Sequence, residues 1–464
     1  MSAYTVAAAC AVLAVLLAAG PDGVQARKGF GDGDQEFGYV DVRDGAHMFY
    51  WLYYIQPEDK SAVKPADKPL VIWLQGGPGA SSTSYGNFME LGPLDANLKR
   101  RNSTWVKHVN VLFIDNPVGT GYSYVDHYSQ LATDNKQIAA DLVAFTKGFM
   151  KTYPQFQKTP LYIFCESYGG KMTAEFALRL YEEQKAGNVL SNLKGVALGD
   201  SWISPIDSVM TWAPYLLHTG MVDTNGYNLI MKGALQTKDF VENGLWDEAT
   251  DEWGNLEGDI DSLTFGVDFY NILSKIQAGE EGSYRGRLRG PTARKPMEVL
   301  YHNHVVSASD DDLNKLMDEK VKPALGVIPD AVRHQTSSSA VFNALGTDFM
   351  KPVTSIVEQL LNETDVKVVV LSGQLDLIVD TPGTLAWVER LHWKMGDFWV
   401  NQATREPLVV DNIIEGFVKD TSRLAFYWIS RAGHMVPADN PAASIEVLKR
   451  VTGLNKKTGN NVDA

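Results

Sequence analysis

The stretch Pro160-Leu-Tyr-Ile-Phe-Cys-Glu-Ser-Tyr-Gly169 decides the fold, because an apolar run leads directly into a tight turn with a serine at its centre. The apolar and aromatic residues at 160–164 predict a buried strand. Residues 170–181 have the pattern of a helix. A serine placed between a strand and a helix in this way is held exposed at the carboxyl end of a sheet. The stretch therefore predicts that Ser167 is a nucleophile.

This turn departs from the usual G-x-S-x-G pattern at one position, where Cys165 replaces the first glycine. Cysteine is small, so the replacement is tolerable. An S-x-G sequence between a strand and a helix also occurs in ordinary βα turns. The interpretation of Ser167 as a nucleophile therefore depends on the rest of the chain.

Further buried strands are predicted on both sides of this turn. They cover residues 69–74, 109–114, 193–198, 366–371 and 424–429, and a helical pattern covers about 131–152. Strands that alternate with helices predict an α/β fold with a mostly parallel sheet and helices on both faces. Residues 36–55 predict a hairpin with a type I′ turn at Asp44-Gly45.

Residues 205–350 differ from the rest, because they are richer in charge and show helical periodicity without clear buried strands. We interpret this region as a helical cap inserted into the sheet domain of residues 27–464. The division remains an expectation from the pattern.

A serine hydroxyl needs a base within hydrogen-bonding reach, and the base needs a carboxylate that orients it. In an α/β-hydrolase these groups follow in the order serine, acid, histidine, each after a strand. Asp376 comes just after the predicted strand 366–371, and His434 follows the strand 424–429 in a loop that contains glycine. Asp380 is a second candidate for the acid, but its position fits less well.

An oxyanion hole requires backbone N–H groups directed at the developing negative charge. One donor should be Tyr168, directly after the nucleophile, and the other should lie in the loop after an earlier strand. The sequence Gln75-Gly-Gly-Pro-Gly79 follows the strand 69–74 in that position. We therefore assign the second donor to Gly77.

These segments together resemble the serine carboxypeptidase family, and most closely its retinoid-inducible branch. The matching motifs are Trp73-Leu-Gln-Gly-Gly-Pro-Gly-Ala-Ser-Ser82, Glu90-Leu-Gly-Pro93, Ile114-Asp-Asn-Pro-Val-Gly-Thr-Gly-Tyr-Ser123, Glu166-Ser-Tyr-Gly-Gly170, Ser372-Gly-Gln-Leu-Asp376 and Gly433-His-Met-Val-Pro437. They occur in the family's order and extend across the chain, which makes the set highly specific.

The resemblance implies an α/β-hydrolase fold and removal of residues from peptide or protein C-termini through an acyl-enzyme. It makes Ser167 the nucleophile, His434 the base and Asp376 its orienting acid, with oxyanion donors at Gly77 and Tyr168. It further implies that the terminal carboxylate of the substrate is held by Gln75, Gly76, Glu90 and Glu166. Carboxyl groups that face a carboxylate must share protons, so the resemblance also implies a preference for acidic pH.

The chain departs from the family pattern at four positions. Gln75 and Asn116 stand where asparagine and glutamine are common, Cys165 replaces a glycine and Ala80 replaces a cysteine. Two alternatives stay open, the first because some proteins that resemble this family transfer acyl groups and the second because Gln75 and Cys165 depart from the pattern. One is an acyltransferase on the same fold, and the other is a non-catalytic secreted binding or scaffold protein.

The chain has 464 residues, a net charge of −14 and a pI near 5.1 without a basic stretch, which argues against nucleic-acid binding. Residues 1–26 have the pattern of a cleaved signal peptide, and no other segment is apolar enough to span a membrane. Cys165 would then remain alone, without an internal disulfide. The sequons at Asn102 and Asn362 fit a glycoprotein that is secreted or lysosomal.

No cofactor is expected from this sequence. His302 and His304 could suggest a metal pair, but no nearby carboxylate or cysteine spacing supports one. The sequence does not indicate an oligomeric state.

Overall fold

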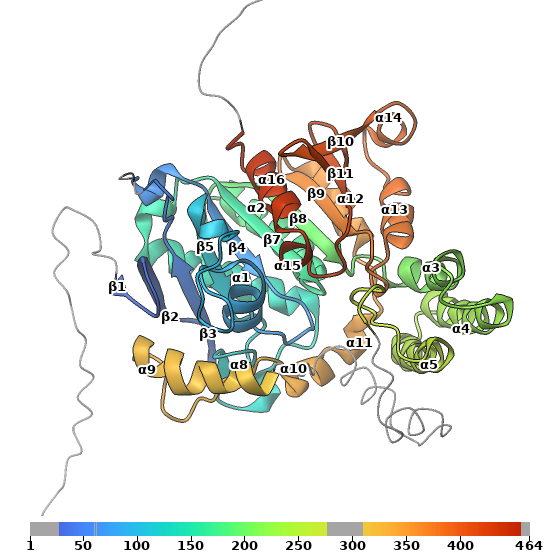
Figure 1. Ribbon diagram of the computed structural model, residues 1–464. Coiled ribbons are helices and arrows are strands. Elements are labelled where there is room, and N and C mark those ends of the chain that lie inside the picture. Colours follow the sequence, from blue (N-terminus) through green and yellow to red (C-terminus); the bar gives the residue numbers. More distant parts are fainter. Residues whose placement is uncertain (1–26, 60, 62, 276–309, 456–464) are drawn as a thin grey trace, which may run out of the picture.

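The computed structural model describes residues 27–59, 61, 63–275 and 310–455. The predicted signal peptide and the pair His302 and His304 lie outside these residues. Figure 1 shows a large twisted sheet with helices packed around it.

The described strands form one sheet in the order β1-β2-β3-β5-β4-β7-β8-β9-β12-β11-β10, with β6 paired to β3. In chain order they are β1 Arg27–Lys28, β2 Asp34–Arg43, β3 Ala46–Tyr53, β4 Leu70–Leu74, β5 Asn110–Ile114, β6 Tyr124–Val125, β7 Leu161–Ser167, β8 Leu193–Ser201, β9 Lys367–Gly373, β10 Arg405–Val410, β11 Ile413–Asp420 and β12 Leu424–Ile429. The central strands from β5 to β12 in this order are parallel, and antiparallel strands extend both edges. The expected α/β architecture with a mostly parallel sheet is confirmed.

The described α-helices are α1 Asn135–Thr152, α2 Gly169–Lys185, α3 Pro205–His218, α4 Thr224–Glu242, α5 Trp246–Thr264, α8 Asp310–Leu316, α9 Lys322–Leu325, α10 Ser339–Ala344, α11 Gly346–Phe349, α12 Thr354–Glu363, α13 Thr381–Glu389, α14 Gly396–Asn401, α15 Val436–Asp439 and α16 Pro441–Val451. A π-helix covers Ser82–Leu91.

Alternation along the buried strands divides the core into two layers. In β4, Ile72 and Leu74 belong to the layer that includes residues of α1 and α2, whereas Val71 and Trp73 belong to the layer that includes residues of α16. Apolar side chains on both faces explain why the central strands read as continuous hydrophobic runs. Because the central strands are packed on both faces, the residues at their carboxyl ends are held in place.

The predicted hairpin forms between β2 and β3, but its turn is not type I′. Gly45 has a φ of 64°, whereas Asp44 does not have a positive φ, and type I′ requires both. A register shift between Asp41 and Arg43 accommodates the turn instead. The hairpin of β10 and β11 at the opposite edge was not predicted from the sequence.

In the described parts of residues 205–350 the regular elements are helices joined by loops, apart from isolated bridges at Gln335 and Ser337. Figure 1 shows α3, α4 and α5 packed together beside the sheet. The treatment of this region as a cap insertion stays a prediction.

Candidate active site

Ser167 is the last residue of β7 and lies directly before the α2 segment, so the predicted elbow forms. Its φ is 61°, in the left-handed region that a serine rarely adopts, which is a strain often found at functional sites. A Cβ on Gly169 would lie 2.6 Å from the carbonyl oxygen of Leu74. This turn therefore requires glycine where strand and helix cross.

Cys165 does not disturb the elbow. Its side chain is buried, and its thiol donates to the carbonyl oxygen of Ala197 at 3.4 Å. Burial raises the pKa of this thiol to about 11. Cys165 is therefore a packing residue rather than a reactive thiol.

The structure brings Asp376 and His434 together at the carboxyl ends of β9 and β12. The Nδ1 atom of His434 lies 2.8 Å from Oδ2 of Asp376, and both side chains are buried. Asp376 also accepts the N–H of Val379 at 3.1 Å. The other ring nitrogen of His434, Nε2, has no hydrogen-bond partner within the described residues, so it can accept a proton.

The alternative acid, Asp380, has a different partner. Its Oδ1 accepts a hydrogen bond from the hydroxyl of Thr211 at 2.8 Å. Asp380 precedes α13, on the side of α3. The geometry therefore supports Asp376 as the partner of His434.

The glycine loop after β4 approaches the elbow very closely. A Cβ on Gly76 would lie 2.6 Å from Cβ of Ser167 and 2.9 Å from the backbone nitrogen of Tyr168. The next residue, Gly77, has a φ of 102° and is half-buried. The two predicted oxyanion donors thus lie on backbone segments that flank the nucleophile.

The side chain of Tyr168 is anchored in a network that the sequence did not predict. Its hydroxyl donates to Oδ2 of Asp348 at 2.8 Å, and the same oxygen lies 2.9 Å from Nζ of Lys171. Burial lowers the pKa of Lys171 to about 8, and the Asp348 charge opposes this effect. Because Asp348 belongs to α11, the network ties the elbow to the helical region.

Gln75, Glu90 and Glu166 form a second cluster of buried polar side chains. The amide nitrogen of Gln75 donates to Oε1 of Glu90 at 3.0 Å and to Oε1 of Glu166 at 2.9 Å. Trp73 donates its indole N–H to the amide oxygen of Gln75 at 2.8 Å, which fixes the amide orientation. We call Glu90 and Glu166 the clamp pair.

The clamp pair retains protons well above the ordinary range of carboxyl groups. Burial raises the pKa of Glu90 to about 7. Burial also raises the pKa of Glu166, and the negative charge of Glu90 adds to this effect. At acidic pH the pair can therefore offer O–H donors, and the two acids also lie within hydrogen-bonding reach of each other.

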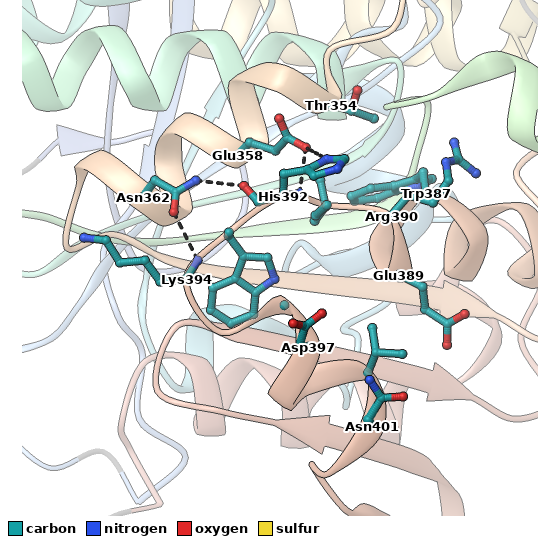
Figure 2. A pocket seen from close by; sticks show the side chains of 14 residues that line it. Thr354, Glu358, Asn362, Trp387, Glu389, Arg390, His392, Lys394, Asp397 and Asn401 are labelled. Carbon is teal, nitrogen blue, oxygen red and sulfur yellow. Dashed lines mark hydrogen bonds and ion pairs between the residues drawn. The ribbon is translucent and has the colours of Figure 1, made fainter.

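A hollow of about 940 Å³ lies away from these residues, between α12, α13 and α14. Figure 2 shows that Asn362 lines it and is held by backbone groups. The Asn362 amide donates to the carbonyl oxygen of His392 at 2.9 Å and accepts the N–H of Lys394 at 3.2 Å. This hollow contains none of the predicted catalytic residues.

Over the described ranges, no cluster of three or more histidine, cysteine, aspartate or glutamate side chains is arranged to hold a metal ion. In the same part of the chain, no helix combines the length and the apolar character that crossing a bilayer requires.

The comparisons agree with this geometry. The serine carboxypeptidase family model matches residues 27–453. The chain is 44% identical to the retinoid-inducible serine carboxypeptidase of Mus musculus over 91% of this chain and 92% of that protein, and 42% identical to that of Homo sapiens with the same coverage. It is 39% identical to serine carboxypeptidase-like 51 of Arabidopsis thaliana, covering 92% and 94%.

Among solved structures, the fold is similar to that of KEX1(delta)P, a prohormone-processing carboxypeptidase from Saccharomyces cerevisiae. The TM-score is 0.71 at 21% identity, with 92% of this chain and 93% of that chain covered. The fold is therefore that of an α/β-hydrolase. The chain belongs to the serine carboxypeptidase family, and it is a serine-type carboxypeptidase.

Proposed function

We propose that Ser167, His434 and Asp376 act as a catalytic triad that removes the C-terminal residue of a peptide through an acyl-enzyme. Nε2 of His434 takes the proton of the Ser167 hydroxyl as the serine attacks the scissile carbonyl. The Asp376 carboxylate holds the imidazole by its Nδ1–H, with the 2.8 Å contact as support. His434 then gives the proton to the departing amino group, and water attacks the acyl-enzyme by the same route.

The backbone N–H groups of Gly77 and Tyr168 are the proposed oxyanion donors. Their support is the close approach of Gly76 to Ser167 and to the Tyr168 nitrogen. Donors fixed by the backbone need no reorganisation as charge develops, which favours the transition state over the substrate.

The clamp pair is the observation that carries the exopeptidase proposal. We assign Gln75, the backbone of Gly76, Glu90 and Glu166 to the terminal carboxylate of the substrate. Protonated acids can donate to that carboxylate, whereas ionised acids would repel it. Because the pKa of Glu90 is about 7, substrate binding should weaken as the pH rises through that value.

The test is release of the terminal amino acid from a blocked dipeptide at pH 4 to 8. We expect activity near pH 5 that is lost in Ser167→Ala and kept in Ser201→Ala, a control at a buried serine near the elbow. A dipeptide with an amidated C-terminus should be cleaved much more slowly. Equal cleavage of both substrates would exclude recognition of a terminal carboxylate.

Two alternatives have distinct results in the same assay. Transfer of the acyl group to an added amine or alcohol, without hydrolysis, would indicate an acyltransferase. A biological role that Ser167→Ala leaves intact would indicate a binding or scaffold protein. The contact between His434 and Asp376 and the clamp pair favour hydrolysis.

We further propose that the chain enters the secretory pathway and is secreted or lysosomal, with Asn102 and Asn362 as glycosylation sites and residues 205–350 as a cap. The signal-like pattern of residues 1–26 and the exposed Asn102 support this. The amide of Asn362 keeps one N–H for His392 after glycosylation, so a sugar could extend into the hollow of Figure 2. Loss of mass on treatment with an N-glycosidase tests both sites.

A further inference from the structure

Asp200 is a buried carboxyl group beside the triad that the proposed mechanism does not use. It lies near the carboxyl end of β8, between β7 and β9, with 1% of its surface exposed. Its Oδ1 accepts the N–H of Gly373 at 2.7 Å. Its backbone φ is 40°, a left-handed value that aspartate and asparagine tolerate better than most residues.

The carboxyl group of Asp200 also lies within hydrogen-bonding reach of the Asp376 carboxyl group. No donor in the described chain reaches Oδ2 of Asp200. A hydrogen bond between two carboxyl groups requires that one of them carries the proton. One proton is therefore shared between Asp200 and Asp376, and the question is which of the two carboxyl groups carries it.

The hydrogen-bond partners of Asp376 indicate which carboxyl group carries the shared proton. One oxygen of Asp376 faces Nδ1 of His434, and the other accepts the N–H of Val379. The Val379 bond requires an acceptor, and the proposed triad makes Asp376 the acceptor of the Nδ1–H of His434 as well, which is the role of an ionised carboxylate. Among the described residues, Asp200 has one backbone donor and no ion pair with a basic side chain, so the proton belongs on Asp200.

The surroundings of Asp200 agree with a neutral group. The acidic side chains that face it are Asp376, Glu166 on the neighbouring β7 and Asp439, the last residue of α15. His434 is the one basic side chain that shares with it a buried cavity of about 20 Å³. Burial and the charge of Asp376 both raise the pKa of Asp200 well above its ordinary value.

We propose that Asp200 is a positioning residue that stays protonated and donates a hydrogen bond to Asp376, which fixes the Asp376 carboxylate against His434. The donor also disperses the negative charge of Asp376. A less concentrated charge holds the proton on His434 less strongly, so more of the base is free at acidic pH. The proposal rests on the triad assigned above.

The test uses inactivation by phenylmethylsulfonyl fluoride, which reacts with an activated serine and has no terminal carboxylate for the clamp pair. The inactivation rate is measured from pH 4 to 9 for wild type, Asp200→Asn and Asp200→Gly. Asparagine keeps the shape and a neutral donor, so its rate should stay within about twofold of wild type with the same pH midpoint. Glycine accepts the positive φ but removes the donor, so its midpoint should rise by about one unit.

With that higher midpoint, the D200G rate at pH 5 should be about tenfold below wild type. Asp380→Ala is the matched control, because Asp380 is equally buried near Asp376 but bonds to Thr211. It should leave the midpoint unchanged. Failure of wild type to be inactivated at Ser167 would count against the proposed triad rather than against the role of Asp200.

Three results would overturn the proposal. A lower midpoint in D200N would show that Asp200 is charged, and a D200N rate more than about tenfold below wild type would show that a neutral donor does not suffice. A wild-type midpoint in D200G would show a merely structural role. Should D200G fail to fold, D200N decides alone: an unchanged midpoint and rate support a neutral Asp200.

Discussion

Two pairs of buried carboxyl groups lie at the same edge of the sheet, and they differ in their partners. The two acids of the clamp pair contact each other and share the neutral amide of Gln75. The other pair, Asp376 with Asp200, contacts the imidazole of His434. All four groups are buried, so the two pairs differ in the hydrogen bonds that their carboxyl groups make rather than in their exposure.

The location of the proton then decides what each pair can do. Glu90 retains its proton up to about pH 7, the pKa of Glu166 is also raised, and both acids can donate to an incoming carboxylate. With a base as partner, Asp376 stays an acceptor and can stabilise an imidazolium. Four changes test this difference between the two pairs.

The largest effect is expected for Asp376→Asn. The asparagine amide would either turn its NH2 group toward Nδ1 or favour the wrong tautomer of His434. We therefore expect kcat to fall about 10³- to 10⁴-fold. Steady-state kinetics at pH 5 measure this, and KM should change little because the clamp pair is untouched. A loss below tenfold would show that Asp376 is not the orienting acid.

The next effect is expected for Glu90→Ala, which removes one member of the clamp pair. KM for a blocked dipeptide should rise about 30-fold at pH 5, with a smaller change in kcat, because a charge-assisted hydrogen bond to the substrate is lost. The amidated dipeptide provides the control, since its reaction should hardly change. An equal loss for both substrates would contradict carboxylate recognition by Glu90.

A smaller effect is expected for Glu90→Gln, which keeps a neutral donor but cannot ionise. Activity at pH 5 should stay within about threefold of wild type. The decline of kcat/KM on the alkaline side should move to higher pH, because Glu90 no longer loses a proton near 7. An alkaline limb identical to that of wild type would assign the decline to another group.

The smallest effect concerns stability. Because the pKa of Glu90 is raised from 4.5 to about 7, the folded state binds more protons than the unfolded state between these values. The free energy of unfolding should therefore fall as the pH rises from 5 to 8, by roughly 2 kcal/mol from this group. Urea unfolding at both pH values measures the fall, which should be shallower in E90Q. A steeper fall in E90Q would contradict the sign.

The sequence predicted the parts of the site that follow strand ends. Ser167, Asp376 and His434 each come within five residues of the end of an apolar run, so their place at one edge of the sheet follows from the pattern alone. Position also favoured Asp376 over Asp380, and the hydrogen bond to His434 supports that choice.

The rest depends on contacts between distant segments, which no local pattern encodes. Glu90 lies on a π-helix and was found only through the family resemblance. Asp200 was missed because β8 runs to Ser201, three residues beyond the predicted strand, so a polar group at its end was not considered. Trp73 was read as a core residue, although its indole N–H orients Gln75.

The positive φ of Ser167 has a consequence for what kind of protein this can be. A serine in that conformation makes the folded chain less stable than a glycine would, by about 1 kcal/mol. A protein that served only as a scaffold would gain from losing this side chain. The strained serine thus marks a position where stability and catalysis are in conflict. Its presence indicates a catalytic role for this residue.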